Sequence, residues 1–216
     1  MDEAFWHERW KKGETAFHEG RPNRFLVAHF ASLGLAAGAR VFMPLCGKSV
    51  DIHWMLAEGF RVVGIDLSAI AISQLFDDLA LTPVLRKQAT GDGELILSSA
   101  DRIDIFVGDL FALDAASLGP VDAVYDRAAL VALPPPMRER YAHHIARITN
   151  TARQLVVSFD YDQALFDGPP FSVPQEEVER LYGPFYEIEN LQQDRVPGGL
   201  KRRAEVDETA LRLTKR

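Results

Sequence analysis

The sequence predicts an α/β fold built on an open, mostly parallel β-sheet, and two observations support this prediction. First, short apolar runs alternate along the middle of the chain with segments whose apolar residues recur at helical intervals. Such alternation is typical of a parallel sheet covered by helices on both faces. Second, only a loop separates the last two strand-like segments, whereas a parallel pair would need a longer crossover. We therefore expect a Rossmann-like sheet of seven strands with a reversed C-terminal edge strand.

The limits of each segment follow from its end signals. Ser68 is suited to cap the helix after the second strand, and the prolines at 134–136 and 174 are suited to open later helices, because a first turn tolerates proline. Residues 94–97 indicate a short hairpin arm. The expected strands cover residues 40–44, 61–66, 103–109, 121–127, 153–162, 185–191 and 208–213, and the expected helices cover residues 48–59, 69–81, 134–149 and 174–183.

Composition limits the class of protein. The chain has 216 residues, with 24 Lys and Arg against 31 Asp and Glu, so its net charge is −7. Without a basic field, nucleic acid and anionic membrane are disfavoured as partners. The single cysteine excludes an internal disulfide and a zinc cluster, and no apolar run approaches the roughly 18 residues of a membrane span. We expect one cytoplasmic domain over residues 1–216, monomeric and without a bound metal.

The N-terminal segment is expected to form a helical lid over that domain, spanning residues 1–35. Two of the three tryptophans, Trp6 and Trp10, lie within the first ten residues among charged neighbours. Scattered surface tryptophans would waste their apolar rings, so packing onto the domain is the better interpretation. For Trp6, an ordinary role in core packing is at least as plausible.

The first predicted strand leads directly into a helix through the turn 43–49, which contains Gly47. A tight strand-to-helix turn of this kind presents backbone amides and a positive helix end to a ligand. The segment does not match a P-loop or the three-glycine dinucleotide pattern, so a pyrophosphate cradle is not expected. Cys46 within the turn is best interpreted as a small buried apolar residue rather than as a nucleophile.

Three further strand ends carry polar residues. Asp66 follows Gly47 by nineteen residues and is suited to accept both ribose hydroxyls of a nucleoside, although it could also cap the helix near Ser68. At the end of the third strand, Asp109 could meet an adenine amino group and Leu110 could cover the ring. The fourth strand ends in Asp126 and Arg127, which form either a ligand contact or a mutual ion pair.

Other polar clusters are assigned no chemistry. His143 and His144 are neighbours on a predicted helix, where they face different ways and cannot chelate one ion together. We expect one of them to be solvated and the other partly buried. The short basic run at 201–203 is expected to be solvated.

Several motifs together resemble the thiopurine S-methyltransferase family. They are WHERW at 6–10, TAFH at 15–18, RVFMPLCGKS at 40–49, VVGIDLS at 62–68, YDRAALVAL at 125–133 and GPPFSVP at 168–174. The resemblance covers nearly the whole chain and fades after about residue 190. It implies S-adenosylmethionine as methyl donor and S-adenosylhomocysteine as product. The donor-site residues that it implies are Trp10, Phe17, Leu45, Gly47, Asp66, Asp109, Leu110 and Arg127, and the acceptor-side residues are Phe17, His18 and Arg127.

The chain departs from the family pattern in two places. Asp66 stands where the family usually has Glu, and residues 199–203 lack a clear match to the arginine segment on the acceptor side, so a role for Lys201 or Arg202 is not carried over. Because a thiolate attacks well, the chemistry needs mainly alignment, with Arg127 favouring an anionic acceptor. Asp126 or His18 would act as a base only for a less acidic thiol.

The implied reaction is methyl transfer to a thiopurine or another aromatic or heterocyclic thiol, with selenium and tellurium compounds as further acceptors in detoxification. Two alternatives remain. One is a halide or small-thiol methyltransferase on the same fold, against which Phe17 and His18 argue, because those relatives carry a Trp-Asp pair there. The other is a module that binds S-adenosylmethionine without catalysis.

Overall fold

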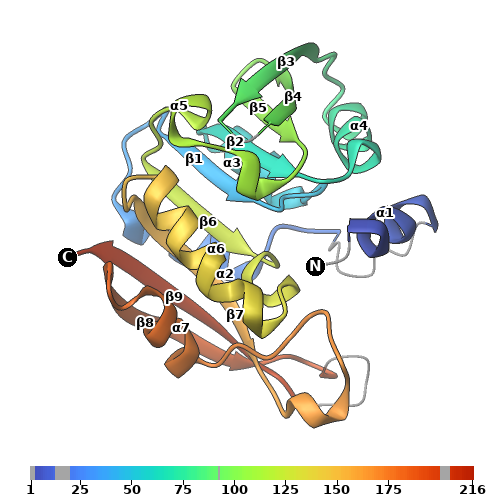
Figure 1. Cartoon of the computed structure of the whole chain (residues 1–216). Helices are drawn as coiled ribbons and strands as arrows, with labels where there is room; N and C mark the ends of the chain where they lie inside the picture. Colours follow the sequence, from blue (N-terminus) through green and yellow to red (C-terminus); the bar gives the residue numbers. More distant parts are fainter. Residues whose placement is uncertain (1–2, 13–19, 92, 200–204) are drawn as a thin grey trace.

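The computed structural model describes residues 3–12, 20–91, 93–199 and 205–216. Over these residues the strands form one sheet in the order β3-β4-β5-β2-β1-β6-β7-β9-β8, with β3 and β4 at one end and β8 and β9 at the other (Figure 1). The strands are β1 (Arg40–Pro44), β2 (Arg61–Asp66), β3 (Val84–Thr90), β4 (Gly93–Ala100), β5 (Ile103–Val107), β6 (Ala123–Arg127), β7 (Arg153–Asp160), β8 (Tyr186–Arg195) and β9 (Asp207–Lys215).

The helices connect and cover these strands. The α-helices are α1 (Glu3–Lys12), α2 (Arg24–His29), α3 (Val50–Ala57), α4 (Ala69–Asp78), α5 (Ala115–Leu118), α6 (Pro135–Ile148) and α7 (Gln175–Tyr182). Short 3-10 turns are η1 (Phe30–Leu33), η2 (Leu110–Ala112), η3 (Leu130–Ala132) and η4 (Gln163–Leu165). None of the helices in the described part of the chain has the length and apolar character that a membrane span requires.

The centre of the sheet is parallel and its two ends are antiparallel. β1 pairs in parallel with β2 on one side and with β6 on the other, so the chain changes direction across the sheet at this point. In sheets of this type, ligands bind at the carboxyl ends of the strands beside such a switch. β9 runs antiparallel between β7 and β8, which confirms the reversed hairpin at the C-terminal edge.

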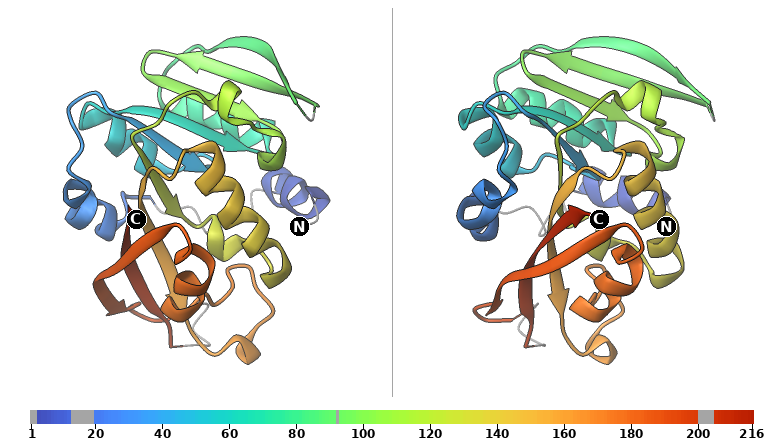
Figure 2. Two further views of the ribbon diagram at one scale, coloured as in Figure 1. Left: turned by 60° about the vertical axis from the view of Figure 1, so that its left-hand side comes forward. Right: turned by 90° about the vertical axis from the view of Figure 1, so that its left-hand side faces the viewer.

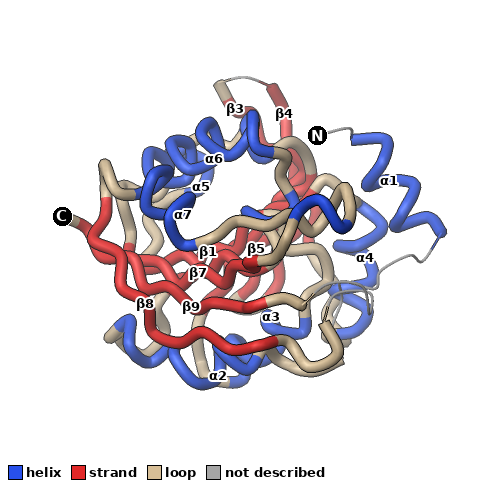
Figure 3. The backbone as a smooth tube through the Cα atoms, turned by 90° about the horizontal axis from the view of Figure 1, so that it is seen from below, coloured by secondary structure: helices blue, strands red, loops and turns tan. Residues whose placement is uncertain are grey.

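Two layers of helices bury the sheet, as Figure 3 shows with α5, α6 and α7 on one side and α2 and α3 on the other. Each layer closes its own apolar cluster. β1 carries Val41, Phe42 and Met43, all at most 4% exposed, because a central parallel strand is covered on both faces. α6 begins at Pro135 as expected, with proline in its first turn.

The structure has more strands than the seven expected. β3 and β4 form a full antiparallel arm, seen as a twisted ribbon at the top of Figure 2, and β4 also pairs with β5. β3 has no buried residue, so it lacks the apolar alternation that reveals a strand in sequence. The arm that was expected at 94–97 is real but extends over Val84–Ala100.

The expected lid of residues 1–35 contains part of the core. Asn23 caps α2 by accepting hydrogen bonds from the amides of Phe25 and Leu26. Phe25, Leu26 and Phe30 are at most 2% exposed and pack with α3 and α4 beneath the sheet. The segment from 24 onward therefore belongs to the sheet domain, and α1 is the described part that lies outside the two layers.

Candidate active site

The turn after β1 is tightly held against β2. Leu45 and Gly47 both have positive φ, 47° and 49°, and the Cys46 amide donates to the carbonyl of Ile65 over 3.1 Å. Positive φ is uncommon for leucine, and such strained residues cluster at ligand-binding sites. Ser49 then caps α3 by accepting from the Asp51 amide. Leu45 and Gly47 thus lie at the carboxyl edge of the sheet.

Asp66 joins two turns through its carboxylate. Its Oδ2 accepts from the Gly47 amide and its Oδ1 accepts from the Ser68 amide, each over 2.8 Å. Ser68 in turn caps α4 by accepting from the Ala71 amide. The helix cap is therefore Ser68, and the Asp66 carboxylate is fixed in orientation between the ends of β1 and β2. A carboxylate held in this way is suited to accept hydrogen bonds from hydroxyl groups at its remaining lone pairs.

Trp10 brings α1 onto this turn. Its side chain is only 5% exposed, and its Cζ2 lies 3.0 Å from where a Cβ on Gly47 would stand. The indole therefore fills the space that the missing side chain leaves, beside the Asp66 carboxylate. Figure 1 shows α1 next to α4. Phe17, His18, Lys201 and Arg202 lie outside the described residues.

The end of β5 continues the same edge. Gly108, at φ 144°, donates its amide to the Asp66 carbonyl over 3.0 Å, and a Cβ there would lie 2.4 Å from Leu95 Cδ2. Asp109 is exposed and accepts from the amide of Phe111. Leu110 is only 3% exposed, and its side chain packs in the core. Asp109 therefore presents an exposed carboxylate at the end of β5, while Leu110 lies in the core beneath it.

Asp126 and Arg127 end β6 but face opposite sides of the sheet, as successive strand residues do. Asp126 is 1% exposed; its Oδ2 accepts from the Tyr141 hydroxyl over 2.7 Å and its Oδ1 from the Leu130 amide over 3.1 Å. Burial raises the pKa of Asp126 to about 6, against the opposing effect of these hydrogen bonds. Its contacts on the α6 side make Asp126 part of the support beneath the turn after β6.

Arg127 is partly exposed, on the face that carries Tyr125 and α3. A buried polar network that sequence reasoning missed surrounds this position. The Tyr125 hydroxyl donates to Asp51 Oδ2 over 3.0 Å, the Asn23 amide donates to Asp51 Oδ1 over 2.7 Å, and Asn23 Nδ2 donates to Glu208 Oε1 over 3.2 Å. Burial and then the Asp51 carboxylate raise the pKa of Tyr125 well above its usual value. The network links β6, α3, the start of α2 and β9 behind the site.

Cys46 and His143 lie as the sequence predicts, and His144 is buried more fully than expected. Cys46 is buried, with Sγ 2.8 Å from where a Cβ on Gly64 would stand, and burial raises the pKa of its thiol well above the usual value. His143 is exposed and His144 is 7% exposed. Within the described ranges, no His, Cys, Asp and Glu side chains gather in a way that could hold a metal ion.

Comparison with known proteins identifies the family of the chain. The model of the thiopurine S-methyltransferase family matches residues 1–215. The chain belongs to this family. It is 54% identical over 209 residues to a thiopurine S-methyltransferase of Xanthobacter autotrophicus, covering 96% of each chain. It is 47% identical over 216 residues to one of Teredinibacter turnerae, covering 100% of this chain and 98% of the relative.

Solved structures support the fold. A 1,6-didemethyltoxoflavin-N1-methyltransferase of Burkholderia thailandensis, solved with S-adenosylhomocysteine, matches with a TM-score of 0.66 at 17% identity, over 99% of this chain and 87% of that one. The N-terminal domain of EvdMO1 with bound S-adenosylhomocysteine gives 0.62 at 14% identity, over 100% and 98%. The chain is thus an S-adenosylmethionine-dependent methyltransferase of the thiopurine S-methyltransferase family.

The residues of the edge fit this donor. The Asp66 carboxylate is fixed at the tip of β2, and the Trp10 ring covers Gly47. At Gly108 the backbone carries no side chain, because Leu95 leaves no room for a Cβ there. A nucleoside needs acceptors for its hydroxyl groups and apolar cover for its ring, and both occur here.

Proposed function

We propose that this methyltransferase transfers the methyl group of S-adenosylmethionine to the sulfur of thiopurines and other aromatic or heterocyclic thiols. The names of the relatives support this acceptor class. The observation that carries the proposal is the Asp66 carboxylate, which two backbone amides orient between the first two strands under the Trp10 ring. That arrangement serves the donor nucleoside, and the arginine at the end of β6 serves the acceptor.

The bound donor supplies a methyl group on a sulfonium that is already activated toward a nucleophile. The task of the chain is then to hold an acceptor sulfur in line with that methyl group, and positioning of this kind contributes up to about 7 to 11 kcal/mol. Asp66 and Asp109 orient the nucleoside, and Trp10 excludes water above the first turn. Arg127 favours the anionic form of the acceptor. Asp126 enters as a positioning group, because its carboxylate is bonded to Tyr141 and to the Leu130 amide.

The loop between β7 and α7 is the proposed wall on the acceptor side. The Tyr161 ring stacks on Phe166 with centroids 4.6 Å apart, and its hydroxyl donates to the Pro170 carbonyl over 2.6 Å. The Phe171 amide donates to the carbonyl of Val131, which follows closely on Arg127 in the chain. These contacts hold an aromatic surface beside the end of β6, as suits a flat heterocyclic acceptor.

A transfer assay with labelled donor tests the acceptor class. We expect methylation of 6-mercaptopurine and thiophenol, and we propose that selenium and tellurium compounds are methylated as well, because they supply similar soft nucleophiles. Methylation of iodide alone would favour the halide alternative, and donor binding in calorimetry without transfer to any acceptor would favour the non-catalytic one. The cytoplasmic location and the monomeric state stay predictions.

Two variants test the residue roles. Asp66→Asn is expected to raise the donor Kd at least about tenfold, because asparagine has one acceptor oxygen and its NH2 group cannot accept from a backbone amide, whereas Asp66 accepts from both Gly47 and Ser68. Asp101→Asn is its matched control, since the Asp101 side chain is 81% exposed. Arg127→Ala is expected to raise the acceptor KM and lower kcat/KM. An unchanged donor Kd in Asp66→Asn together with unchanged acceptor kinetics in Arg127→Ala would contradict the proposed site.

A further inference from the structure

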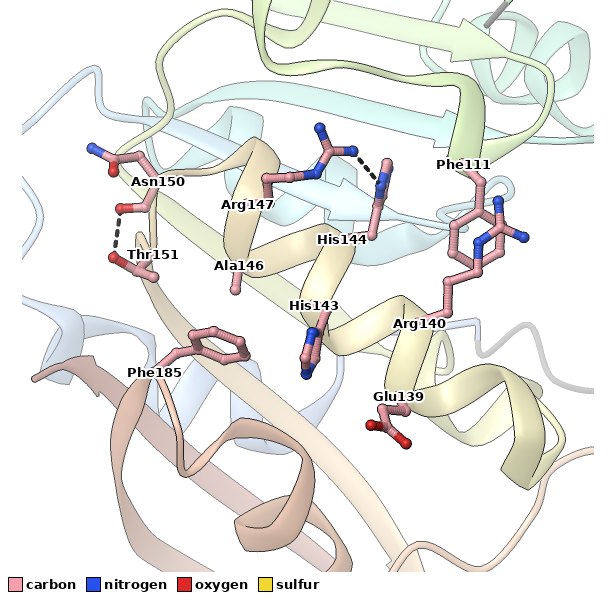
Figure 4. Close-up of a pocket in the computed structure, with 10 residues that line it drawn as sticks. All are labelled: Phe111, Glu139, Arg140, His143, His144, Ala146, Arg147, Asn150, Thr151 and Phe185. Atoms are coloured by element: carbon pink, nitrogen blue, oxygen red, sulfur yellow. Dashed lines mark hydrogen bonds between the residues drawn. The ribbon is translucent and has the colours of Figure 1, made fainter.

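A groove that the methyl-transfer chemistry does not use lies along the outer face of α6. It has a volume of about 760 Å³ and runs from Phe111 in η2 to Phe185 before β8 (Figure 4). α6 supplies most of its surface, including Arg140, His143 and Arg147. The opposite face of the same helix carries Tyr141, which contacts Asp126 in the core. The helix thus separates this groove from the turn after β6.

The groove is basic on an acidic protein. Its lining includes Arg140 and Arg147, and Glu139 is the one acidic residue among the lining side chains of the described chain. The chain as a whole carries a net charge of −7. The two arginines are seven positions apart, so they lie on one face of α6, about 10 Å apart along its axis. A local excess of guanidinium groups on such a background favours an anionic ligand.

Both guanidinium groups are held in place by neighbours. His144 Nε2 donates to the Leu110 carbonyl over 2.9 Å, so its Nδ1 is left to accept from Arg147 Nη2 over 3.0 Å. Burial lowers the pKa of His144, which favours the neutral ring that this arrangement needs. The Arg140 guanidinium lies 3.8 Å from the centre of the Phe111 ring. Side chains that are already ordered lose less entropy when they bind a ligand.

Aromatic rings provide the second element of recognition. His143 meets Phe185 edge to face with ring centres 5.0 Å apart, and Figure 4 shows these two rings on the side of α6 that faces β8. Phe111 lies at the other end, beneath Arg140. Guanidinium groups pair with phosphate or carboxylate oxygens, and the rings offer surfaces for a flat ligand.

We propose that this groove binds a flat aromatic anion, such as an aryl phosphate, as a second ligand site apart from the methyl-transfer cleft. Arg147 holds the anionic group, the ring of the ligand packs against Phe185 and His143, and Arg140 adds positive charge at the Phe111 end of the groove. The binding is non-covalent. This inference does not depend on the identity of the methyl acceptor.

Isothermal titration with 4-methylumbelliferyl phosphate tests the site, with S-adenosylhomocysteine present at saturation to block the donor cleft. We expect one binding event per chain. Inorganic phosphate carries only the anionic group and 4-methylumbelliferone only the aromatic ring system. Each is expected to bind at least about tenfold more weakly than the aryl phosphate. Absence of binding up to about 5 mM aryl phosphate would overturn the proposal, as would equal affinity for inorganic phosphate.

Variants place the binding in the groove. Arg147→Gln is expected to weaken aryl phosphate binding at least about tenfold, because it removes charge-assisted hydrogen bonds. Arg140→Gln is expected to weaken the binding by a smaller factor, because it removes only a more distant positive charge. Arg61→Gln and Arg86→Gln, at exposed positions outside the groove, are the charge-matched controls. Phe185→Leu is expected to weaken the aryl phosphate while leaving inorganic phosphate unchanged. Equal binding by all variants would assign the titration to another part of the molecule and overturn the site.

Discussion

Polar residues at the strand ends stabilise the fold as well as lining the candidate site. Asp126 is a candidate catalytic base by its sequence motif, yet its oxygens accept hydrogen bonds from the Tyr141 hydroxyl and the Leu130 amide in the core. Asp66 ends β2, which β1 separates from β6, and its partly exposed carboxylate holds the turn after β1 at the edge of the sheet. Within the motif on β6, strand alternation sends Asp126 and Arg127 to opposite faces, so these two neighbours have different surroundings.

Asp126 should make the stability of the protein depend on pH. Its pKa is about 6 in the folded protein and near 4 in the unfolded chain, so it binds its proton more tightly when folded. The resulting stabilisation is fully present below about pH 4 and is lost as the pH rises through 6. Relative to Asp126→Asn, the free energy of unfolding of the wild type should fall by about 2 kcal/mol between pH 4 and pH 7. Urea titrations across this range measure the difference.

A surface carboxyl provides the comparison for that experiment. Asp101→Asn, at an exposed position, should leave the pH dependence of the wild type unchanged. Parallel curves for the wild type and Asp126→Asn would show that Asp126 has an ordinary pKa in the folded protein.

A side chain at Gly47 should strain the backbone and weaken donor binding. In Gly47→Ala the new Cβ would stand 3.0 Å from Trp10 Cζ2 at a φ of 49°, so the indole must move. We expect a loss of about 1 kcal/mol in stability from the strain and a larger loss in donor affinity. Gly38→Ala is a matched control, because Gly38 has φ 75° but nothing within 4 Å of its Cβ position. Calorimetry should show weaker donor binding in the first variant only.

At the scale of elements, the sequence predicts the parallel centre well because its strands are buried on both faces. β1 and β2 match their expected bounds, and the cap at Ser68 and the prolines before α6 and α7 are where they were expected. The apolar periodicity does not reveal elements that bury few residues or that are very short. β3 has no buried residue, and α2 is six residues long, too short for a clear helical period. The buried link between Asn23 and Glu208 joins residues 185 apart in sequence, which no local pattern reveals.

The loop on the acceptor side should depend on an ion pair between α6 and α7. Arg138 is 1% exposed; its Nη1 donates to Glu177 Oε2 over 2.7 Å, and its Nε donates to the Leu133 carbonyl. The guanidinium also lies 5.6 Å from the centre of the Phe171 ring. Glu177→Gln should lower stability by about 2 kcal/mol and raise the acceptor KM more than the donor KM, because the loop loses its support. Steady-state kinetics and thermal melts measure both effects.

The same helix supplies the control for this variant. Glu179→Gln changes an exposed carboxylate that accepts from Gln175, so its kinetics should match the wild type. Equal changes in the donor and acceptor KM of Glu177→Gln would point to a general loss of structure instead of a local effect on the loop.

At the scale of the whole molecule, α1 stands apart from the two layers that close the sheet. Trp10 is its buried side chain, whereas Phe5 is 36% exposed and Glu8 is 54% exposed. An isolated helix this short is marginal in water, so α1 depends on its contacts with the rest of the protein. Few contacts therefore balance the entropy cost of ordering α1, and a bound donor beneath Trp10 should shift this balance toward the docked state.

This balance predicts the behaviour of a chain that starts at residue 13. Its melting temperature without ligand should lie within a few degrees of the full-length value, because Phe25, Phe30 and the rest of the core stay in place. The rise in melting temperature that S-adenosylhomocysteine causes in the full chain should be largely lost. Without Trp10 the ligand binds more weakly, and a ligand that binds more weakly stabilises the folded state less. Phe5→Ala, on the exposed side of α1, should keep the full rise. A truncated chain that still shows the full rise would mean that α1 contributes nothing to donor binding, and Gly47→Ala should then also bind the donor normally.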